Sequence, residues 1–497
     1  MIFYATFFSI IMVIFQSCSV KGANDPFSLA PKKNNTPWTP PAKDKRMSTP
    51  KLIDDDLHNE VEKYSKALCL SLAEIIDIAL IQSPLTKQSW AAARSSAAAY
   101  GQSLQDLFVL ADIDSFYSRE RSTNILGDLS STFFTTEYGG DVSLSYIILD
   151  FGQIRDTSEA ALQSLIDADW THNSQIQQTI QTVTTEYYDY LYQKKLLQAR
   201  KQDVLDAEVS LKATSEKFEQ GLADISDVVQ AKTNTLSQQL NVVTQKQTLH
   251  TSYTTLVATI GLPANRVFHF QDYPSKNFNI KLETISNLLE EASKNRPDLL
   301  AAEANVKSAV STLSAAKKQK YPTVSSEFDF GKYFYQDGIS DPGIHFNAQV
   351  SLSYPLFQGF YIDNTIKKAQ ASISTAQANL QLVQLDIIKE ISNYRNNIKC
   401  AQESIDYAES YLNSAQEEFK VNLKKYQVGT GNIINLISAQ TSVSDARAQL
   451  AQAQNNFFTS VANLSFATGI LKTAKKSEQK TSYFDQLKTQ QEEKDYE

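Results

Sequence analysis

Hydrophobic and polar residues alternate in two pairs of short stretches, and this alternation predicts β-strands. From Ile344 to Tyr354 the apolar residues occupy every second position, and Val142 to Ile148 shows the same pattern. A period of two places apolar side chains on one face of a strand and polar ones on the other. Weaker alternations precede both stretches. We expect strands at about 108–118, 138–149, 322–334 and 343–355, joined by loops at 119–135 and 335–342.

The pattern becomes helical directly after the second strand of each pair. Residues from about 153 to 219 and from about 361 to 427 include no proline and no glycine, so each stretch can form one helix roughly 100 Å long. Apolar residues recur every seven positions, as in a coiled-coil seam. They are Ile176, Val183, Tyr190, Leu197, Val204, Leu211 and Phe218, then Ile391, Ile398, Ile405, Leu412, Phe419 and Tyr426.

Each long helix is expected to end at a glycine, Gly221 or Gly429, and to return as a shorter helix over about 222–260 or 432–468. This predicts two long helical hairpins. One further helix is expected at about 71–106, before the first strand. Placed end to end, this helix and the first return helix would match the long helix in length.

The two halves of the chain are copies of one unit. "VSLSY" occurs at 142–146 and at 350–354, and "KFEQGLADISDVVQA" at 217–231 matches "KYQVGTGNIINLISA" at 425–439 with the same offset of 208 residues. Repeated units of this kind are copies of one supersecondary structure. We assign repeat 1 to 70–262, the inter-repeat linker to 263–281 and repeat 2 to 282–471.

In both repeats the strand must give way to the helix over a few residues. Pro355, followed by Gly359, can end strand pairing in repeat 2, because proline cannot donate a ladder hydrogen bond. Repeat 1 has Ile147 in place of the proline, so the change must occur at Asp150, Phe151 and Gly152.

The strand pairs allow two interpretations. A soluble sheet with its apolar face on a core fits the alternation. A membrane barrel fits it too, and two observations favour it: the strands have about the 9–11 residues that a tilted membrane strand needs, and the polar face is acidic. Four strands cannot close a barrel, and open edges are not tolerated in lipid, so the chain must then oligomerise. The acidic residues are Asp112, Asp114, Glu137, Asp141, Glu327 and Asp329.

The chain begins with a short apolar run that predicts export. Residues 1–18 have the length of a signal peptide, and Cys18 directly after the apolar run resembles a lipidation site. The alternative is an ordinary cleaved signal. Residues 19–69 are rich in proline, lysine and asparagine and indicate an extended leader. The charged residues 472–497 indicate a mobile tail.

Composition argues against several classes of function. The net charge of −8 and a pI near 5.4 speak against a nucleic-acid partner, since no basic face collects the lysines and arginines. The five histidines stand alone, without an HExxH or CxxC motif, so we assign no catalytic, cofactor-binding or metal-binding residue and expect no enzyme. Cys69 and Cys400 are expected to be buried and unpaired.

Five segments together resemble the TolC-like outer membrane factor family. They are "LDFG" at 149–152, "FEQGLADISDV" at 218–228, "LSYPLFQGF" at 352–360, "YQVGTGNIINLISAQ" at 426–440 and "LSFATG" at 464–469. The resemblance implies a homotrimer with a 12-stranded outer-membrane barrel and an α-helical tunnel across the periplasm. An equatorial region would be built from the linker and the chain ends. It implies an exit duct, without enzymatic activity, for an inner-membrane pump coupled through a periplasmic adaptor.

The resemblance also implies roles for residues at the hairpin ends. Gly221 and Gly429 would be the periplasmic tips where an adaptor docks. The closed aperture would lie just beyond them, at Asp224, Asp227, Asn432, Asn435 and Ser438. Helix capping is an equally good explanation for Asp224 and Asn432. A different class of function also remains open, namely an exported coiled-coil structural or adaptor protein without a membrane barrel.

Overall fold

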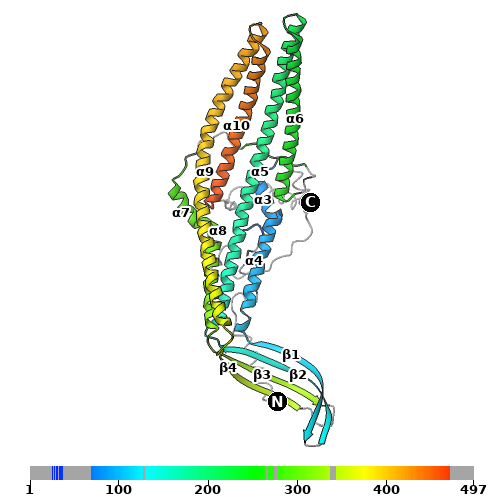
Figure 1. Ribbon diagram of the computed structural model, residues 1–497, viewed down its shortest axis with the longest axis vertical. Helices are drawn as coiled ribbons and strands as arrows, with labels where there is room; N and C mark the ends of the chain where they lie inside the picture. Colours follow the sequence, from blue (N-terminus) through cyan, green and yellow to red (C-terminus); the bar gives the residue numbers. More distant parts are fainter. Residues whose placement is uncertain are drawn as a thin grey trace, which may run out of the picture.

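The protein is an elongated shaft of helices with a β-sheet at one end (Figure 1). The computed structural model describes residues 69–126, 129–262, 264, 267–273, 278, 280–335 and 343–470, together with residues 25, 27, 30, 31 and 33–36. Cys18, the rest of the expected signal peptide and the expected tail lie outside the described residues. No helix of the described part is long and apolar enough to cross a membrane.

The sheet has four antiparallel strands in the order β1-β2-β3-β4. Strands β1 (Leu110–Leu126) and β2 (Leu129–Leu149) come from repeat 1, and β3 (Thr323–Tyr335) and β4 (Gly343–Ser353) come from repeat 2. Two tandem repeats therefore contribute two strands each, which confirms the predicted fold class. The β2–β3 contact joins the repeats within one continuous sheet.

The expected loop at 119–135 is wrong, because β1 and β2 continue through almost all of it. Leu126 pairs with Leu129, so the two strands form a ribbon longer than the 13 and 11 residues of β3 and β4. The alternation that located the strands fades beyond Ser118, where polar residues such as Arg119, Glu120 and Thr123 occupy both faces. Periodicity therefore gave no signal for the outer part of this ribbon.

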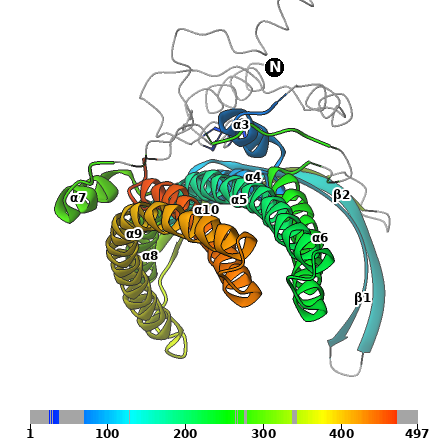
Figure 2. The ribbon, with the colours of Figure 1, turned by 90° about the horizontal axis from the view of Figure 1, so that it is seen from above.

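Two long helical hairpins form the shaft. Helices α5 (Gln153–Glu219) and α9 (Tyr361–Gln427) have 67 residues each, roughly 100 Å, and return as α6 (Ile225–Ile260) and α10 (Ile433–Ala467). Their turns lie together at the end of the shaft away from the sheet (Figure 1). Viewed from above, the helices follow one curved layer (Figure 2).

A proline interrupts the helical segment before each strand pair. Instead of one helix at 71–106, repeat 1 has α3 (Leu72–Gln82) and α4 (Pro84–Ser103). Repeat 2 has α7 (Ile285–Asn295) and α8 (Pro297–Lys318). The residue before a proline is disfavoured in the helical region, and proline is well accommodated at the first helical position. Pro84 and Pro297 therefore end one helix and begin the next.

The return helices meet these proline junctions end to end. A Cβ atom on Gly261, at the end of α6, would stand 2.9 Å from the carbonyl carbon of Gln82, and one on Gly469 would stand 2.7 Å from that of Asn295. Both glycines have positive φ, 86° and 72°. Glycine thus serves two purposes here, because it permits the left-handed turn and the close backbone approach. The shorter helices stack in this way to match the long ones.

Arg296 holds the junction in repeat 2. Its side chain is buried and lies 2.7 Å from Glu390 of α9, pairs with Asp298, and donates to the Ala467 carbonyl at the end of α10. Burial lowers the pKa of the guanidinium, but the two carboxylates outweigh this and raise it. The buried arginine is tolerated because two carboxylates, Asp298 and Glu390, compensate its charge.

The main core lies at mid-height, where both repeats meet the linker. Tyr187 and Tyr188 of α5 pack with Phe457 and Phe458 of α10, and Phe270 of the linker joins the same cluster. The Tyr187 hydroxyl donates to the Gln271 carbonyl at 2.8 Å. The linker is thereby fixed to the middle of the shaft.

The two predicted seams differ in the structure. In α9 the positions Ile391, Ile398 and Ile405 are buried as a coiled-coil seam requires. In the tip half of α5 the predicted seam is only partly apolar. Leu211 packs on the cluster of Tyr426 and Leu436, whereas Phe218 is 41% exposed and Asp203, next to the seam position Val204, is buried. The reason is that this face of α5 packs on α10 through polar groups.

The change from strand to helix uses left-handed residues in both repeats. Phe151 and Gly152 have φ of 56° and 82°, and Gly359 and Phe360 have φ of 58° and 62°. The Asp150 carboxylate accepts hydrogen bonds from the Gly152 and Ile154 amides and so caps α5. A bulky residue at positive φ is uncommon, and here the same choice occurs in both repeats.

Short parts of the leader lie along α4 and α3. The contacts are Phe27 under the Arg94 guanidinium at 4.1 Å, the Pro31 carbonyl accepting from Trp90 Nε1 at 2.6 Å, and Asn34 donating to the Ile81 carbonyl at 2.9 Å. From Phe27 to Asn34 the leader contacts helix residues of decreasing number, from Arg94 to Ile81, so the leader runs antiparallel to α4 and α3. Phe27, the first of these leader residues, therefore lies nearer the sheet than Asn34 does.

Two titratable side chains of α5 are completely buried in this region. Burial raises the pKa of Asp169 to about 8 and lowers the pKa of His172 to about 4, although the backbone of Thr36 and Lys33 partly opposes the latter shift. His172 Nδ1 lies 2.8 Å from the Ser89 hydroxyl. Both groups are therefore uncharged near pH 7, the form that a buried site favours.

The expectation that Cys69 and Cys400 are buried is wrong, since both are exposed. Neither position belongs to a core cluster, and a lone cysteine carries no pattern from which its exposure could be read.

The end-to-end junction can be tested with two glycine substitutions. Gly261→Ala should lower the free energy of unfolding by about 3 kcal/mol, since left-handed strain of roughly 1 kcal/mol is added to a backbone clash. Gly221→Ala is the control, because Gly221 has φ of 69° but nothing within 4 Å of its Cβ position. It should cost only about 1 kcal/mol. Equal losses in thermal melting of the purified protein would contradict the stacked junction.

Candidate functional site

The sheet has one acidic and one apolar face. The strand register places Asp114 directly opposite Asp141, and Ser143 between Asp112 and Asp329. Like charges opposite each other on neighbouring strands are destabilising unless water screens them. All six acidic residues expected on the polar face lie on this one face, which therefore suits an aqueous surface.

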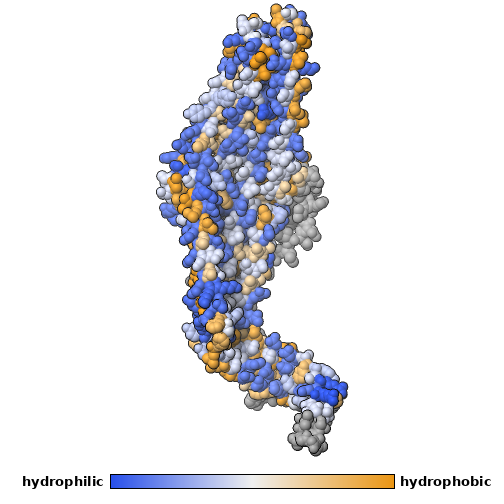
Figure 3. Space-filling model, in the orientation of Figure 1, coloured by the Kyte–Doolittle hydropathy of each residue, from blue (hydrophilic) through white to orange (hydrophobic). Residues whose placement is uncertain are grey.

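The opposite face is apolar and unusually exposed. Ile113 is 83% exposed, Val350 is 70% and Leu352 is 69%. An exposed apolar face of this kind needs a partner or a lipid environment. On the side shown in Figure 3, hydrophobic residues also gather where the shaft meets the sheet. At the connection between β4 and α9, Leu356, Phe357, Phe360 and Tyr361 are all exposed.

The sheet has two edge strands, β1 and β4, that lack a partner strand among the described residues. An edge strand presents a row of unpaired N–H and C=O groups that can pair with another chain. The sheet is therefore an incomplete unit that other copies can extend.

The hairpin ends lie at the far end of the shaft. Gly221 and Gly429 adopt positive φ at the two turns. Asp224 caps α6 by accepting from the Ser226 amide at 2.9 Å, and Asn432 caps α10 by accepting from the Asn435 amide at 2.8 Å. Capping thus accounts for both residues, as the alternative explanation held.

Asp227 contacts the other hairpin. Its Oδ2 accepts a hydrogen bond from the Tyr426 hydroxyl at 3.4 Å, and Lys217 Nζ lies 4.6 Å from the centre of the Tyr426 ring. Burial raises the pKa of the Tyr426 phenol, a hydrogen bond with Thr214 opposes this, and the Asp227 carboxylate raises it further. Tyr426 therefore stays protonated and able to donate. The remaining candidates, Asn435 and Ser438, have exposed side chains.

A second polar network joins the hairpins below the tips. Arg447 of α10 donates to Asp203 at 2.6 Å and to Asp206 at 2.8 Å, both on α5. Ser444 donates to the other oxygen of Asp203 at 2.7 Å, and Arg200 donates to Ser444. Asp203 is almost completely buried, and these partners compensate the cost of burying its carboxylate.

Sequence reasoning missed both Tyr426 and the Arg447 network. Tyr426 was interpreted only as the last apolar residue of a seam, although a phenol near a turn can also donate a hydrogen bond. The Arg447 partners lie more than 200 residues away along the chain, so spacing carried no signal. Asp203 itself gave no hint, because the residues around it, such as Arg200, Lys201 and Gln202, are also polar.

Among the described residues, no three histidine, cysteine, aspartate or glutamate side chains are grouped so that they could hold a metal ion. The arrangement instead combines a two-faced sheet with hairpins whose tips are joined by polar contacts. These features are typical of a membrane-associated protein.

Comparison with protein families agrees with this geometry. The family model described as outer membrane efflux protein matches residues 75–262 and 288–470, which is most of the chain and covers both repeats. The chain belongs to the outer membrane efflux protein family. Membership supports the expectation of a transport protein that is not an enzyme.

Individual relatives are distant. The outer membrane protein TolC of Escherichia coli is 24% identical over 320 residues, which cover 61% of this chain and 64% of TolC. The corresponding match to TolC of Salmonella enteritidis covers 55% of that protein, so the chain spans less than two thirds of these two relatives. Protein CyaE of Bordetella pertussis is 22% identical over 384 residues, 76% of this chain and 79% of CyaE.

Solved structures share the fold. The outer membrane channel CmeC of Campylobacter jejuni superimposes with a TM-score of 0.73 at 17% identity, covering 94% of this chain and 98% of CmeC. The outer membrane protein VceC of Vibrio cholerae gives a TM-score of 0.72 at 17% identity, covering 83% and 98%. The fold is therefore shared over nearly the whole length of both solved chains.

The Arg447 network predicts a large stability effect. Arg447→Ala should cost about 3 kcal/mol, because it leaves the buried Asp203 carboxylate poorly compensated. The double variant Asp203→Asn/Arg447→Met removes both charges and should recover part of the loss. Lys399→Ala breaks only an exposed 3.9 Å pair with Glu403 and should cost less than about 0.5 kcal/mol. Similar melting temperatures for Arg447→Ala and Lys399→Ala would rule out a structural role for the network.

Proposed function

We propose that the chain forms the outer-membrane exit duct of a tripartite efflux or type I secretion system. The observation that carries the proposal is a single sheet with an apolar face, an acidic face and two edges that no described strand pairs, continuous with hairpins roughly 100 Å long. A closed ring of such sheets would be a barrel in the outer membrane, and the hairpins would extend it through the periplasm. Substrates would pass through it passively.

The proposed assembly is a homotrimer, in which three four-stranded sheets give 12 strands. Exposed apolar rows support contacts between neighbouring copies. On α6 they fall at helical spacing, on Ile225, Val229, Leu236, Leu240 and Val243, and on α9 the exposed apolar residues include Leu382, Leu385, Tyr407 and Val421. Such rows are typical of helix faces that lack their partner.

The proposed partners are a periplasmic adaptor that docks at the hairpin tips, around Gly221 and Gly429, and an inner-membrane transporter. The relative TtgC of Pseudomonas putida is named a probable efflux pump outer membrane protein. The acidic face would line the lumen and favour cations over anions.

Reconstitution in a planar lipid bilayer tests the proposed function. The purified protein should insert, conduct ions and give a reversal potential in a KCl gradient that indicates cation preference. Cells expressing it should carry it in the outer-membrane fraction. A protein that fractionates away from outer membrane and gives no conductance would favour the alternative, an exported coiled-coil structural or adaptor protein.

The aperture role of Asp227 is tested in the same bilayer. Asp227→Ala and Tyr426→Phe both remove the 3.4 Å contact between the hairpins, so both should raise the resting conductance and the sensitivity of cells to large antibiotics. Asp224→Ser is the control, because serine preserves the helix cap. Unchanged conductance in both aperture variants would contradict the assignment.

Cys18 is proposed to carry a lipid anchor. The antiparallel leader supports this, since the nine residues from Cys18 to Phe27 can span roughly 30 Å and the contacts run toward the sheet. Cells fed radioactive palmitate should label the protein, and Cys18→Ser should abolish the label, whereas Cys69→Ser should not. Label that persists in Cys18→Ser would exclude this site.

A further inference from the structure

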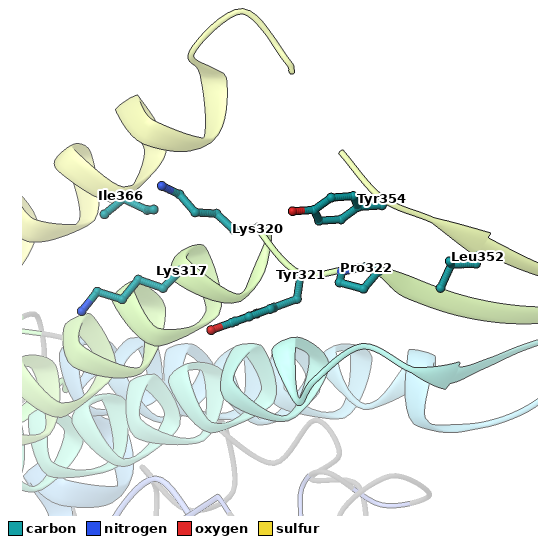
Figure 4. A pocket seen from close by; sticks show the side chains of 7 residues that line it. All are labelled: Lys317, Lys320, Tyr321, Pro322, Leu352, Tyr354 and Ile366. Atoms are coloured by element: carbon teal, nitrogen blue, oxygen red, sulfur yellow. The ribbon is translucent and has the colours of Figure 1, made fainter. Parts of the chain in front are cut away.

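A pocket of about 760 Å³ lies where repeat 2 passes between sheet and shaft. It is formed by the end of α8, the start of β3, the end of β4 and the beginning of α9 (Figure 4). Its volume is within the range of small-molecule sites. The lining residues are Lys317, Lys320, Tyr321, Pro322, Leu352, Tyr354 and Ile366.

One wall of the pocket continues the apolar face of the sheet. Leu352 pairs with Val324, and Val350, two residues earlier in β4, pairs with Ser326, so Leu352 and Val350 lie on the same face. Tyr354 continues this alternation beyond the end of β4. The pocket therefore opens on the face that the proposed function assigns to lipid.

The other wall is basic. Lys317 forms no ion pair with any described residue, and Lys320 lies 2.7 Å from Asp363, with both side chains about half exposed. Lys318, between them, is turned away to α5, where it pairs with Asp156 at 2.7 Å. Figure 4 shows the Tyr354 hydroxyl directed toward the side that Lys320 lines. Two ammonium groups and two phenols thus border an apolar surface.

Repeat 1 lacks this chemistry. The connection from α4 to β1, residues 104–109, contains no lysine or arginine and includes Asp106. The basic wall is therefore not a requirement of the strand-to-helix architecture, because the other repeat makes the same connection without it.

Aromatic side chains occur in the segments that join the sheet to the shaft. Tyr321 packs on Phe151 with ring centres 5.3 Å apart, and Phe357 packs on Phe360 at 5.5 Å. Aromatic girdles of this kind mark the boundary between lipid and water in membrane barrels. The lysines accordingly lie at the level of lipid headgroups, where long basic side chains are favoured.

We propose that this pocket binds the headgroup of an anionic phospholipid from the membrane leaflet next to the helical shaft. The phosphate would lie between Lys317 and Lys320, and the acyl chains would follow Leu352 and Val350 along β4. The inference rests on the proposed membrane barrel. It adds a specific lipid to that proposal, held by repeat 2 alone.

Binding to the purified full-length protein in a neutral detergent tests the proposal. Native mass spectrometry would measure the affinity for dihexanoyl phosphatidylglycerol, with dihexanoyl phosphatidylcholine and inorganic phosphate as comparisons. The anionic lipid should bind more tightly than the other two. At low salt each lysine near an anionic headgroup is worth about fivefold in affinity, so Lys317→Gln/Lys320→Gln should weaken binding roughly 25-fold.

Two further variants separate the site from general charge effects. Asp363→Asn releases Lys320 from its ion pair and should tighten binding about fivefold, a gain that misfolding cannot produce. Lys399→Gln/Lys420→Gln removes the same charge from α9, beginning 33 residues beyond Ile366 or roughly 50 Å along the helix, and should change nothing.

The outcomes have distinct meanings. Equal affinity of the wild type and Lys317→Gln/Lys320→Gln for the anionic lipid would overturn the proposal. Inorganic phosphate binding as tightly as the lipid would overturn it in favour of an anion site, and equal binding of the zwitterionic lipid would overturn it in favour of an apolar groove. Outer-membrane fractionation and bilayer conductance, measured on the same variants, show separately whether the proposed duct function stands.

Discussion

The structure depends on the need to pair every backbone polar group that enters a membrane. In the part of the chain that the structure describes, the four-stranded sheet leaves β1 and β4 with free edges, and such edges are not tolerated in lipid. The apolar face is exposed in a single chain, and the acidic face needs water. All three conditions are met together only when copies join edge to edge and enclose the acidic face. In the proposed duct, the sheet of one chain is therefore a segment of a ring.

The helical shaft follows from the same ring. Each strand continues into, or arises from, a helix, so a closed barrel would place the helices in a closed layer. This requires one outgoing helix to be matched by two shorter helices joined end to end. Gly261 and Gly469 make the joints possible, and Arg296 fixes one of them to α9 and α10. At the far end, Asp227 and Arg447 hold the two hairpins together through polar contacts.

Much of the fold was predictable because it follows local rules. Alternation located the strands, the absence of glycine and proline located the long helices, and the offset of 208 residues revealed the repeat. The prediction of secondary structure failed where local rules conflict or give no signal. Polar residues on both faces gave no alternation in the outer part of β1 and β2, a proline divided a helix that looked continuous, and the buried Asp203 lies beside the seam position Val204 rather than in it. The contacts of Tyr426 and Arg447 depend on distant segments, and the pocket at Lys317 arises only when four elements meet.

Electron microscopy of the detergent-purified protein, classified without imposed symmetry, tests the central claim most directly. The account predicts hollow, tapered particles with threefold end views and a helical portion roughly 100 Å long, as the rise of α5 and α9 requires. Solid rods or single chains without a ring would contradict it, because the edges of β1 and β4 would then have no partner and the apolar face of the sheet could not lie in lipid.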